Sequence, residues 1–381
     1  MGKLADLLEV GTPEPNYAPS FGVDGPGGRA LTVSLEGDHD ASTDAELLRA
    51  LGHDPDHWSF AVPPAVYRKV LEDGTVKFTN YRYKLEPRSD ARGGGDDGSA
   101  LAARILARSA RRTPYPNPTG AAFNFQASDL QLGKSDNGGT EAIVDRFLDS
   151  VEIAVGKLEQ ARVHRSIPLV HIMFPGDCIE GNQSQSGRNM WRTELTVTEQ
   201  TRVFRALMYR TIEAFADIAD RVYVDVVNGN HDEVQRFQTT RPDDGHATES
   251  ALAVREGLAL NGDAFGHVEV RVPPVDQGYM TVPVGDTVFT IAHGHQWRRG
   301  KAMDWWKGQT FYGHNAGGAH LLVHGHFHEF ETERAGARMR ICSPTYDQGS
   351  NYYREMTGAV SPPGGLVYVT GGGEFSDLSI V

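Results

Sequence analysis

The sequence predicts an α/β fold for the chain from about residue 120 onward. Between 120 and 260, short apolar runs of strand length alternate with longer segments in which apolar residues recur at helical spacing. Beyond 260, apolar runs of strand length follow one another with little helix between them. The first pattern is typical of parallel strands joined by helices, and the second predicts a further sheet rich in antiparallel strands.

Each expected element has its own signal. The run 167–174 is almost wholly apolar, which predicts a buried strand, whereas 140–162 carries apolar residues three and four positions apart, which predicts a helix. By the same signals, the other expected strands are 121–127, 221–227, 267–272, 279–283, 287–293, 321–327, 337–342 and 365–370, and the other expected helices are 193–219 and 247–260.

The first part of the chain predicts a small separate module. Residues 42–52 carry a Ser/Thr start signal and a Gly stop signal for a short helix. Residues 64–86 alternate apolar and polar side chains around Asp73-Gly74, which predicts a β-hairpin. The expected division is a flexible Gly- and Pro-rich arm at 1–30, the module at 31–90, a linker with a basic helix at 91–115 and the main domain at 116–381.

The basic helix of the linker has two interpretations. Arg104, Arg108 and Arg112 recur at helical spacing, and no acid occurs between Asp97 and Asp129. These arginines could contact phosphates, or the segment could be a solvated connector.

Composition and charge exclude several classes of protein. The 50 acidic residues outnumber the 37 basic ones, so the net charge of −13 disfavours generic polyanion binding, and a nucleic-acid contact would need a local basic patch. The only cysteines, Cys178 and Cys342, cannot form a disulfide scaffold and favour a reducing compartment. No apolar run approaches the length of a membrane span or a secretory signal, so we expect a cytoplasmic protein without membrane contact.

Polar side chains gather at the ends of five expected strands. In open α/β sheets such positions share one crevice beyond the carboxyl ends of the strands. The five clusters are Asp129 with Gln131, Asp177 with Glu180, Asn230 with His231, His293 with His295, and His324 with His326 and His328.

This mixture of side chains suits a site for two metal ions. Two divalent cations about 3.5–4 Å apart can clamp the attacking and leaving oxygens of a phosphoester. Asp177, in a tight Gly-Asp turn, could bridge both, and imidazoles add affinity for Mn, Fe, Co, Ni or Zn over Mg. Asn230 offers a neutral oxygen ligand, and His231 could protonate the leaving oxygen.

Each cluster alone also has an ordinary structural explanation. Asp129 could be a strand-end carboxylate, Asn230-His231 a turn, and His293 a buried histidine bound to the backbone. His326 and His328, two positions apart on one expected strand face, are harder to explain in this way. Five such clusters in one chain favour the metal site.

The ordered motifs resemble those of the calcineurin-like metallophosphoesterase superfamily: Asp-x-Gln at 129–131, Gly-Asp-x-x-Glu at 176–180, Gly-Asn-His at 229–231, His293, and Gly-His-x-His at 325–328. The resemblance spans 120–372 and implies a four-layer αββα sandwich of two mixed sheets with helices outside. It implies one ion at Asp129, Gln131, Asp177 and His328 and a second at Asp177, Asn230, His293 and His326. It also gives His231 the role of leaving-group acid, oriented by Glu180.

Two positions depart from the usual motifs. Gln131 stands where the superfamily has His, so one ion would bind loosely or favour Mn or Mg. Glu180 replaces Asp, and Gly181 replaces an Arg of the protein phosphatases, which argues against a phosphoprotein substrate. These variants are similar to phage-encoded phosphoesterases, which are compared with the nuclease subunit of double-strand-break repair complexes.

Candidate substrate contacts lie near two of the clusters. The segment 297–307 combines bases with tryptophans, a combination that holds single-stranded nucleic acid, although a helix packing its tryptophans on the sheet would have the same composition. The candidate residues are Lys134, Trp297, Arg298, Arg299 and Lys301.

The sequence thus predicts a dimetal phosphoesterase that hydrolyses phosphodiester bonds, with DNA as the expected substrate. A metal-activated water would attack phosphorus, with His231 as leaving-group acid. The expected cofactors are two divalent ions, Mn first, with Mg, Fe, Zn, Co or Ni as alternatives. Other hypotheses are a small-molecule phosphomonoesterase or nucleotide phosphodiesterase and a catalytically decayed binding module. The oligomeric state stays open, with a dimer among the options, and a phage-encoded chain would reside in the cytoplasm of its bacterial host.

Overall fold

The computed structural model describes most of the chain as two compact units, Val10–Ser99 and Ala100–Val381. The described residues are 31–36, 41–51, 53, 55, 58–60, 63–71, 74–83, 85–87, 97–110, 120–182, 193–235, 240–347 and 362–381. The arm expected at 1–30 lies outside them. In the described part of the chain, no helix is both long and apolar enough to cross a membrane.

The first sheet of the larger unit has the order β16-β15-β6-β7-β8-β9. Four neighbouring strands are parallel, and two antiparallel strands extend the sheet beyond β6. Their bounds are β6 Ala122–Gln126, β7 Leu169–Pro175, β8 Arg221–Val227, β9 Val268–Arg271, β15 Leu366–Gly371 and β16 Glu374–Ile380. Every residue of β6 and β7 is buried, which explains why these strands are mostly apolar, with Asn124, Gln126 and His171 as buried polar exceptions.

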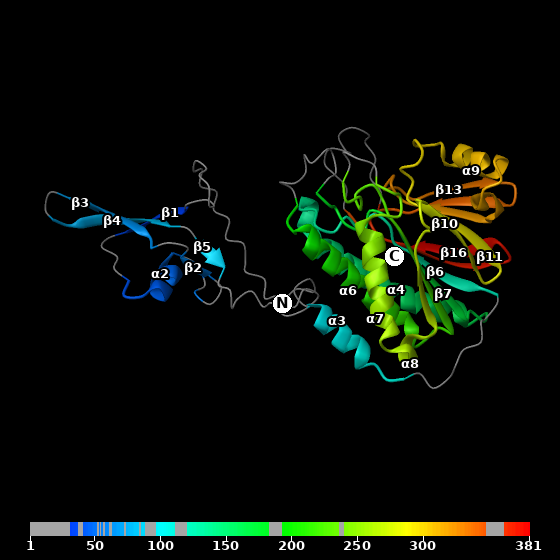
Figure 1. Ribbon diagram of the computed structural model, residues 1–381, viewed down its shortest axis with the longest axis horizontal. Helices are drawn as coiled ribbons and strands as arrows, with labels where there is room; N and C mark the ends of the chain where they lie inside the picture. The colour runs from blue at the N-terminus through cyan, green and yellow to red at the C-terminus, as the bar shows by residue number, and fades with distance from the viewer. Residues whose placement is uncertain are drawn as a thin grey trace. The chain divides into compact units, whose positions relative to one another are not determined.

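Helices cover one face of this sheet (Figure 1). They are α4 Gly139–Arg162, α6 Val197–Ala216, α7 His246–Ala259 and α8 Gly262–Phe265. Helix α6 begins at a capping box in which Thr196 and Glu199 satisfy each other's backbone N–H groups. Phe147 of α4 and Phe204 of α6 both pack on Phe174 of β7, so the helix layer and the sheet share one core.

The basic helix α3, Asp97–Leu106, packs against the same helix layer. Ile105 is buried in that core, and the guanidinium groups of Arg104 and Arg108 lie 2.8 and 2.9 Å from the carboxylate of Glu213 on α6. Arg112 lies outside the described residues. Both described arginines are therefore engaged by an acid of the protein itself.

The second sheet has the order β10-β11-β12-β14-β13. Its strands are β10 Tyr279–Val284, β11 Thr287–Ala292, β12 Leu321–His324, β13 Glu331–Ala335 and β14 Arg338–Cys342. The three central strands are parallel and only the two edge strands are antiparallel, so the expectation of an antiparallel-rich sheet is wrong. Segments between the central strands run back across the sheet, among them α9 Ala302–Phe311 and the 3-10 turn η3 Asn315–Gly318.

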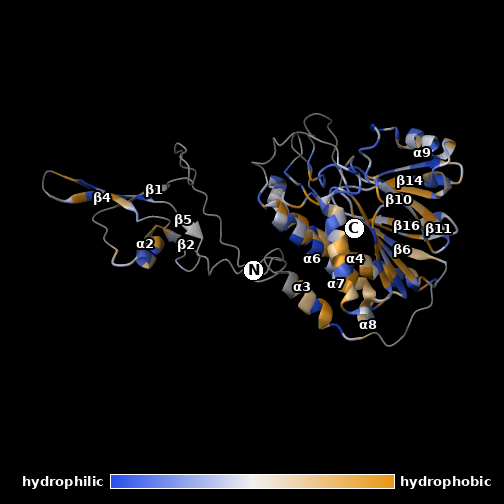
Figure 2. Cartoon of the chain, viewed as in Figure 1, coloured by the Kyte–Doolittle hydropathy of each residue, from blue (hydrophilic) through white to orange (hydrophobic). Residues whose placement is uncertain are grey.

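The two sheets pack face to face, which confirms the predicted fold class. Leu169 and Met173 of β7 share a core cluster with Phe289 of β11, Leu321 of β12 and Ile341 of β14. On the far side of the second sheet, Met303 and Trp306 of α9 pack on Leu322 and Ala292. The layers are therefore helices, sheet, sheet and helix, with hydrophobic residues both in the strands and on the helices that pack against them (Figure 2).

The smaller unit is built on the predicted hairpin. Strands β3 Ala65–Val70 and β4 Val76–Tyr83 pair antiparallel, and β1 Leu31–Glu36 adds to β4. The predicted short helix is α2 Asp44–Ala50, capped by Thr43. A further two-stranded ladder joins β2 Trp58–Phe60 to β5 Leu85–Pro87.

A chain of polar side chains crosses the buried first sheet. His171 lies with Nδ1 3.1 Å from Asn124 Oδ1 and Nε2 2.7 Å from Asp225 Oδ2. Arg271 donates to both oxygens of Asp225, at 2.6 and 2.8 Å. Because His171 and Asp225 are fully buried, these contacts compensate the loss of their hydration.

We expect Arg271→Met to lower the free energy of unfolding by about 3–5 kcal/mol, because it leaves the buried Asp225 carboxylate without its main counter-charge. Urea unfolding followed by far-UV circular dichroism measures this. Arg165→Met is the matched control, since Arg165 pairs with Asp377 at the surface and its loss should cost less than about 1 kcal/mol. Equal losses for both variants would show that the network does not stabilise the sheet.

Candidate metal centre

All five clusters predicted from the sequence follow the carboxyl ends of central strands. Asp129 and Gln131 follow β6, Asp177 follows β7, and Asn230 with His231 follow β8. His293 follows β11 of the second sheet directly. His326 and His328 follow β12, which ends at His324, so the expectation that they share a strand face is wrong and both lie in the turn beyond it.

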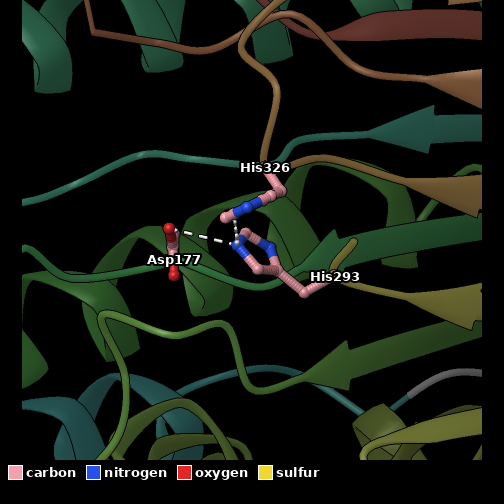
Figure 3. Close-up of side chains that lie close together, drawn as sticks. All are labelled: Asp177, His293 and His326. Carbon is pink, nitrogen blue, oxygen red and sulfur yellow. Dashed lines mark hydrogen bonds and ion pairs between the residues drawn. The ribbon is translucent and has the colours of Figure 1, made fainter. Parts of the chain in front are cut away.

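Three of these side chains form a compact donor group. Asp177, His293 and His326 each offer one ligand atom, and the three atoms lie within 4.8 Å of one another (Figure 3). His293 Nε2 is 3.1 Å from Asp177 Oδ2 and 3.2 Å from His326 Nδ1. Donors bound at about 2.0–2.2 Å to one cation lie roughly 3.0–3.6 Å apart, so these separations fit a metal ion.

A second pair of donors lies beside the first group. His328 Nε2 is 3.2 Å from Asp129 Oδ1, and the backbone N–H of His326 donates to both oxygens of Asp129, at 3.2 and 3.0 Å. The backbone N–H of His231 donates to Asp177 Oδ1 at 2.7 Å, which also brings the turn containing Asn230 to this carboxylate. The structure therefore brings the predicted ligands of both sheets together.

The two carboxylates suit a cation, but His293 must lose a proton before it can bind a metal ion. Burial alone would lower the pKa of His293, but the charge of Asp177 outweighs burial and raises this pKa to about 9. Burial raises the pKa of Asp129 and Asp177, but the neighbouring histidines outweigh it and hold both pKa values below the usual range, so both side chains are carboxylates. Burial, reinforced by the charge of His293, lowers the pKa of His326 to about 4, which keeps this imidazole neutral and able to bind a metal.

The backbone at the candidate ligands is unusual. Seven described residues other than glycine have positive φ, and five of them are candidate ligands. A side chain in this left-handed region costs free energy that the surrounding packing must supply, and such residues cluster at functional sites. These five are Asp129 (φ 53°), Gln131 (φ 47°), Asp177 (φ 50°), His326 (φ 71°) and His328 (φ 58°).

Glycines allow the loops to meet. A Cβ atom on Gly325 would lie 1.8 Å from Ser128 Oγ and 2.1 Å from Asp129 Oδ2. A Cβ atom on Gly229 would lie 2.1 Å from Asp177 Oδ1. Each glycine is therefore required for a close approach between a turn and a candidate ligand.

Asp232 belongs to the site, although the sequence motifs predict no role for it. Its carboxylate accepts N–H groups from Gly229 at 2.7 Å, Cys178 at 3.1 Å and Ile179 at 3.2 Å, so it ties the turn after β8 to the turn after β7. Burial and the charge of Asp177 raise the pKa of Asp232 to about 7. Its position directly after Gly-Asn-His was the available signal, but the backbone donors come from a distant loop.

His231 lies between two acids. Its Nδ1 is 3.3 Å from Glu180 Oε2 and 3.1 Å from the Glu180 carbonyl oxygen, and its Nε2 is 3.9 Å from Asp177 Oδ2. Burial alone would lower the pKa of His231, but the charges of Asp177 and Glu180 raise it to about 9. From the protein's own charges, this imidazole carries a proton at neutral pH.

Gln131 and Lys134 interact with each other beside the donors. Lys134 Nζ donates to Gln131 Oε1 at 3.2 Å and forms an ion pair with the buried Asp347. Gln131 Nε2 lies 3.4 Å from His328 Nε2. The amide oxygen thus faces the ammonium group, and Gln131 would have to give up this contact to bind a cation through that oxygen.

The predicted substrate-binding segment after His293 is largely engaged in the fold. Trp297 is only 8% exposed and packs on Trp305, with ring centroids 4.8 Å apart. Arg299 pairs with Glu329 and Glu331, and Lys301 lies 3.0 Å from Asp304. Arg298 is exposed. Most of the tryptophan surface therefore faces the sheet.

We expect Gly325→Ala to weaken binding of Mn²⁺ by roughly 10- to 100-fold, because the new methyl group would displace Asp129. Isothermal titration calorimetry measures the affinity. Gly318→Ala is the control, since no atom lies within 4 Å of its added Cβ. Unchanged affinity in Gly325→Ala would mean that Asp129 does not bind the ion.

We expect Gln131→His to tighten binding of one of two Mn²⁺ ions, because an imidazole replaces an amide that is engaged by Lys134. Two-site analysis of a manganese titration tests this. If neither binding constant changes, residue 131 does not contribute a ligand.

Comparisons with known proteins give distant matches among solved structures and no family. No family model matches the chain, and no curated protein matches it. An archaeal phosphodiesterase is 13% identical, with a TM-score of 0.32, over 68% of this chain and 99% of that chain. Vacuolar protein sorting 29 from Cryptosporidium parvum is 13% identical, with a TM-score of 0.33, over 69% and 98%. A predicted phosphoesterase from Streptococcus pneumoniae is 11% identical, with a TM-score of 0.28, over 66% and 85%. Similarity at this level does not assign an activity.

Proposed function

We propose that this protein is a phosphodiesterase that uses two divalent cations and acts on nucleic acid. The observation that carries the proposal is the grouping of Asp177, His293 and His326, with the pair Asp129 and His328 beside them. Two buried carboxylates surrounded by imidazoles are donors suited to a divalent cation.

The proposed ligand sets follow the two donor groups. One cation would take Asp129, Asp177, His328 and residue Gln131, and the other Asp177, Asn230, His293 and His326. When bound, the cations would activate a water molecule and neutralise charge on the phosphoryl oxygens. The mixed nitrogen and oxygen donors suit Mn²⁺, which we propose as the working metal.

His231 is placed to serve as the leaving-group acid. Its Nδ1 faces Glu180, which leaves Nε2 on the side of Asp177. An imidazolium held in this way can donate its Nε2 proton to the departing oxygen, while Glu180 keeps the ring oriented.

Two features bear on the substrate. The combination of Asp-Leu-Gln-Leu-Gly-Lys at 129–134, Gly-Asp-x-x-Glu-Gly at 176–181 and Gly-Asn-His at 229–231 is similar to phage-encoded phosphoesterases of the repair-nuclease type, which supports a nucleic acid. The net charge of −13 supports the second candidate, a small phosphoester, because a long polyanion is repelled outside local basic patches.

With Mn²⁺, we expect the protein to hydrolyse single-stranded DNA and bis-p-nitrophenyl phosphate at fixed salt, and His231→Ala to lower kcat by about 10²–10⁴-fold. Metal occupancy in His231→Ala should stay unchanged. His164→Ala is the matched control. His164 is exposed and precedes β7, so it lies near the amino ends of the strands, whereas the site lies at their carboxyl ends.

Hydrolysis of mononucleotides but not of DNA would select the small-molecule alternative. Absence of any hydrolysis by a metal-loaded protein would leave a binding module, and full activity of His231→Ala would remove this residue from the acid role.

We expect Glu180→Gln to move the alkaline limb of the kcat/KM profile to lower pH. Glu180 raises the pKa of His231, so the charged imidazolium of His231 persists to about pH 9 in the protein without cations. Bound cations would repel this charge and lower the pKa of His231. Activity that needs the protonated imidazole is present below this pKa and lost above it, and removing the carboxylate lowers the pKa. An unshifted limb, equal to that of the exposed control Glu159→Gln, would contradict the proposed pairing.

A further inference from the structure

The three-stranded sheet of the smaller unit has two unlike faces. Side chains alternate across a strand, and the register pairs Tyr67 with Asn80, Lys69 with Phe78, and Ala65 with Arg82. Members of each antiparallel pair lie on the same face. The register therefore sorts the side chains of β3 and β4 into two sets.

One face of the sheet is covered at β4, whereas Val66 and Arg68 of β3, on the same face, are exposed. Tyr81 and Tyr83 of β4 are buried at 3% and 2% exposure and pack with Leu47 and Leu51, which lie on and just after α2. The core of the smaller unit therefore lies entirely on this side of the sheet, as far as the described residues extend.

The other face is open and combines aromatic rings with cations. Tyr67 is 67% exposed, and Lys69 and Arg82 are exposed beside it. The ammonium group of Lys69 lies 5.7 Å from the centre of the half-buried Phe78 ring. Asn80, directly across from Tyr67, adds an amide that can both donate and accept hydrogen bonds.

The charge of the three strands contrasts with that of the chain. Of their four bases, Lys69 and Arg82 lie on the open face, whereas Arg68 and Lys77 alternate to the other face. Their one acid, Glu36, pairs with Phe78 of the open face. The chain as a whole has 13 more acids than bases. The open face therefore carries one more base than acids, in a protein that is acidic overall.

We propose that this open face binds single-stranded nucleic acid, with bases stacked on Tyr67 and Phe78 and phosphates near Lys69 and Arg82. Exposed rings on a sheet provide stacking surfaces for unpaired bases, and flanking cations follow the backbone. The alternative partner is a protein strand that pairs with the edge of β3. Such a strand would bind through backbone hydrogen bonds and would use neither the rings nor the positive charge of this face.

This inference extends the proposed function, since such a face would hold the polymer whose phosphodiester bonds are hydrolysed. The proposed binding face, however, lies within the smaller unit, and binding of nucleic acid to it requires no metal. Binding and hydrolysis can therefore be tested separately.

The test is fluorescence anisotropy of a labelled single-stranded DNA oligonucleotide with the full-length protein in EDTA at fixed salt. Tyr67→Ala is expected to weaken binding about tenfold through loss of one stacked base. Lys69→Gln should weaken binding, whereas Lys77→Gln should not, because alternation places Lys77 on the other face of β4. An abasic oligonucleotide of equal length should bind more weakly than the normal one.

Three results would overturn the inference: affinity of Tyr67→Ala within twofold of the unmodified protein, equal effects of Lys69→Gln and Lys77→Gln, or equal affinity for the abasic oligonucleotide. Because Tyr67 is exposed, its replacement should leave the thermal unfolding midpoint unchanged, which checks folding. Binding in EDTA without hydrolysis in Mn²⁺ would overturn the proposed function alone. Hydrolysis of DNA with unchanged binding by Tyr67→Ala would overturn this inference alone.

Discussion

The buried carboxylate of Asp177 is the feature on which the rest of the site depends. It lies in a left-handed turn at the end of β7, accepts the N–H of His231 and contacts His293 from the other sheet. The carboxyl ends of the central strands of both sheets must therefore lie side by side for their loops to meet. The core between the sheets sets the alignment of these strand ends, and Gly229 permits the turn after β8 to approach Asp177. A carboxylate this deeply buried needs positive charge beside it, which histidines supply in the protein alone and cations would supply in the proposed enzyme.

Much of the fold follows from local sequence patterns, and the exceptions have a common cause. The buried strands β7 and β8 are mostly apolar runs and are predicted from the sequence, whereas β13 and β16 are edge strands with mostly exposed polar side chains and give no such signal. Their existence depends on the neighbouring strand. Likewise, nothing local to β11 and β12 specifies that they pair in parallel.

The site shows the same division. Short-range motifs identified Asp177, His293 and His326, because glycine-flanked polar residues after apolar runs are unusual. The backbone contacts of Asp232 and the ion pair of Lys134 with Asp347 join segments far apart in the chain, so no local pattern could predict them. The tryptophans after His293 illustrate the opposite problem, since a base- and tryptophan-rich segment has the same composition whether its rings face substrate or the core.

The most direct test of two cations around Asp177 is anomalous diffraction at the manganese edge, from crystals grown with Mn²⁺. We predict two peaks about 3.5–4 Å apart, one beside His293 and His326 and the other beside Asp129 and His328, with the Asp177 carboxylate between them. Absence of any peak at Asp177 when manganese is present in excess would contradict the central claim.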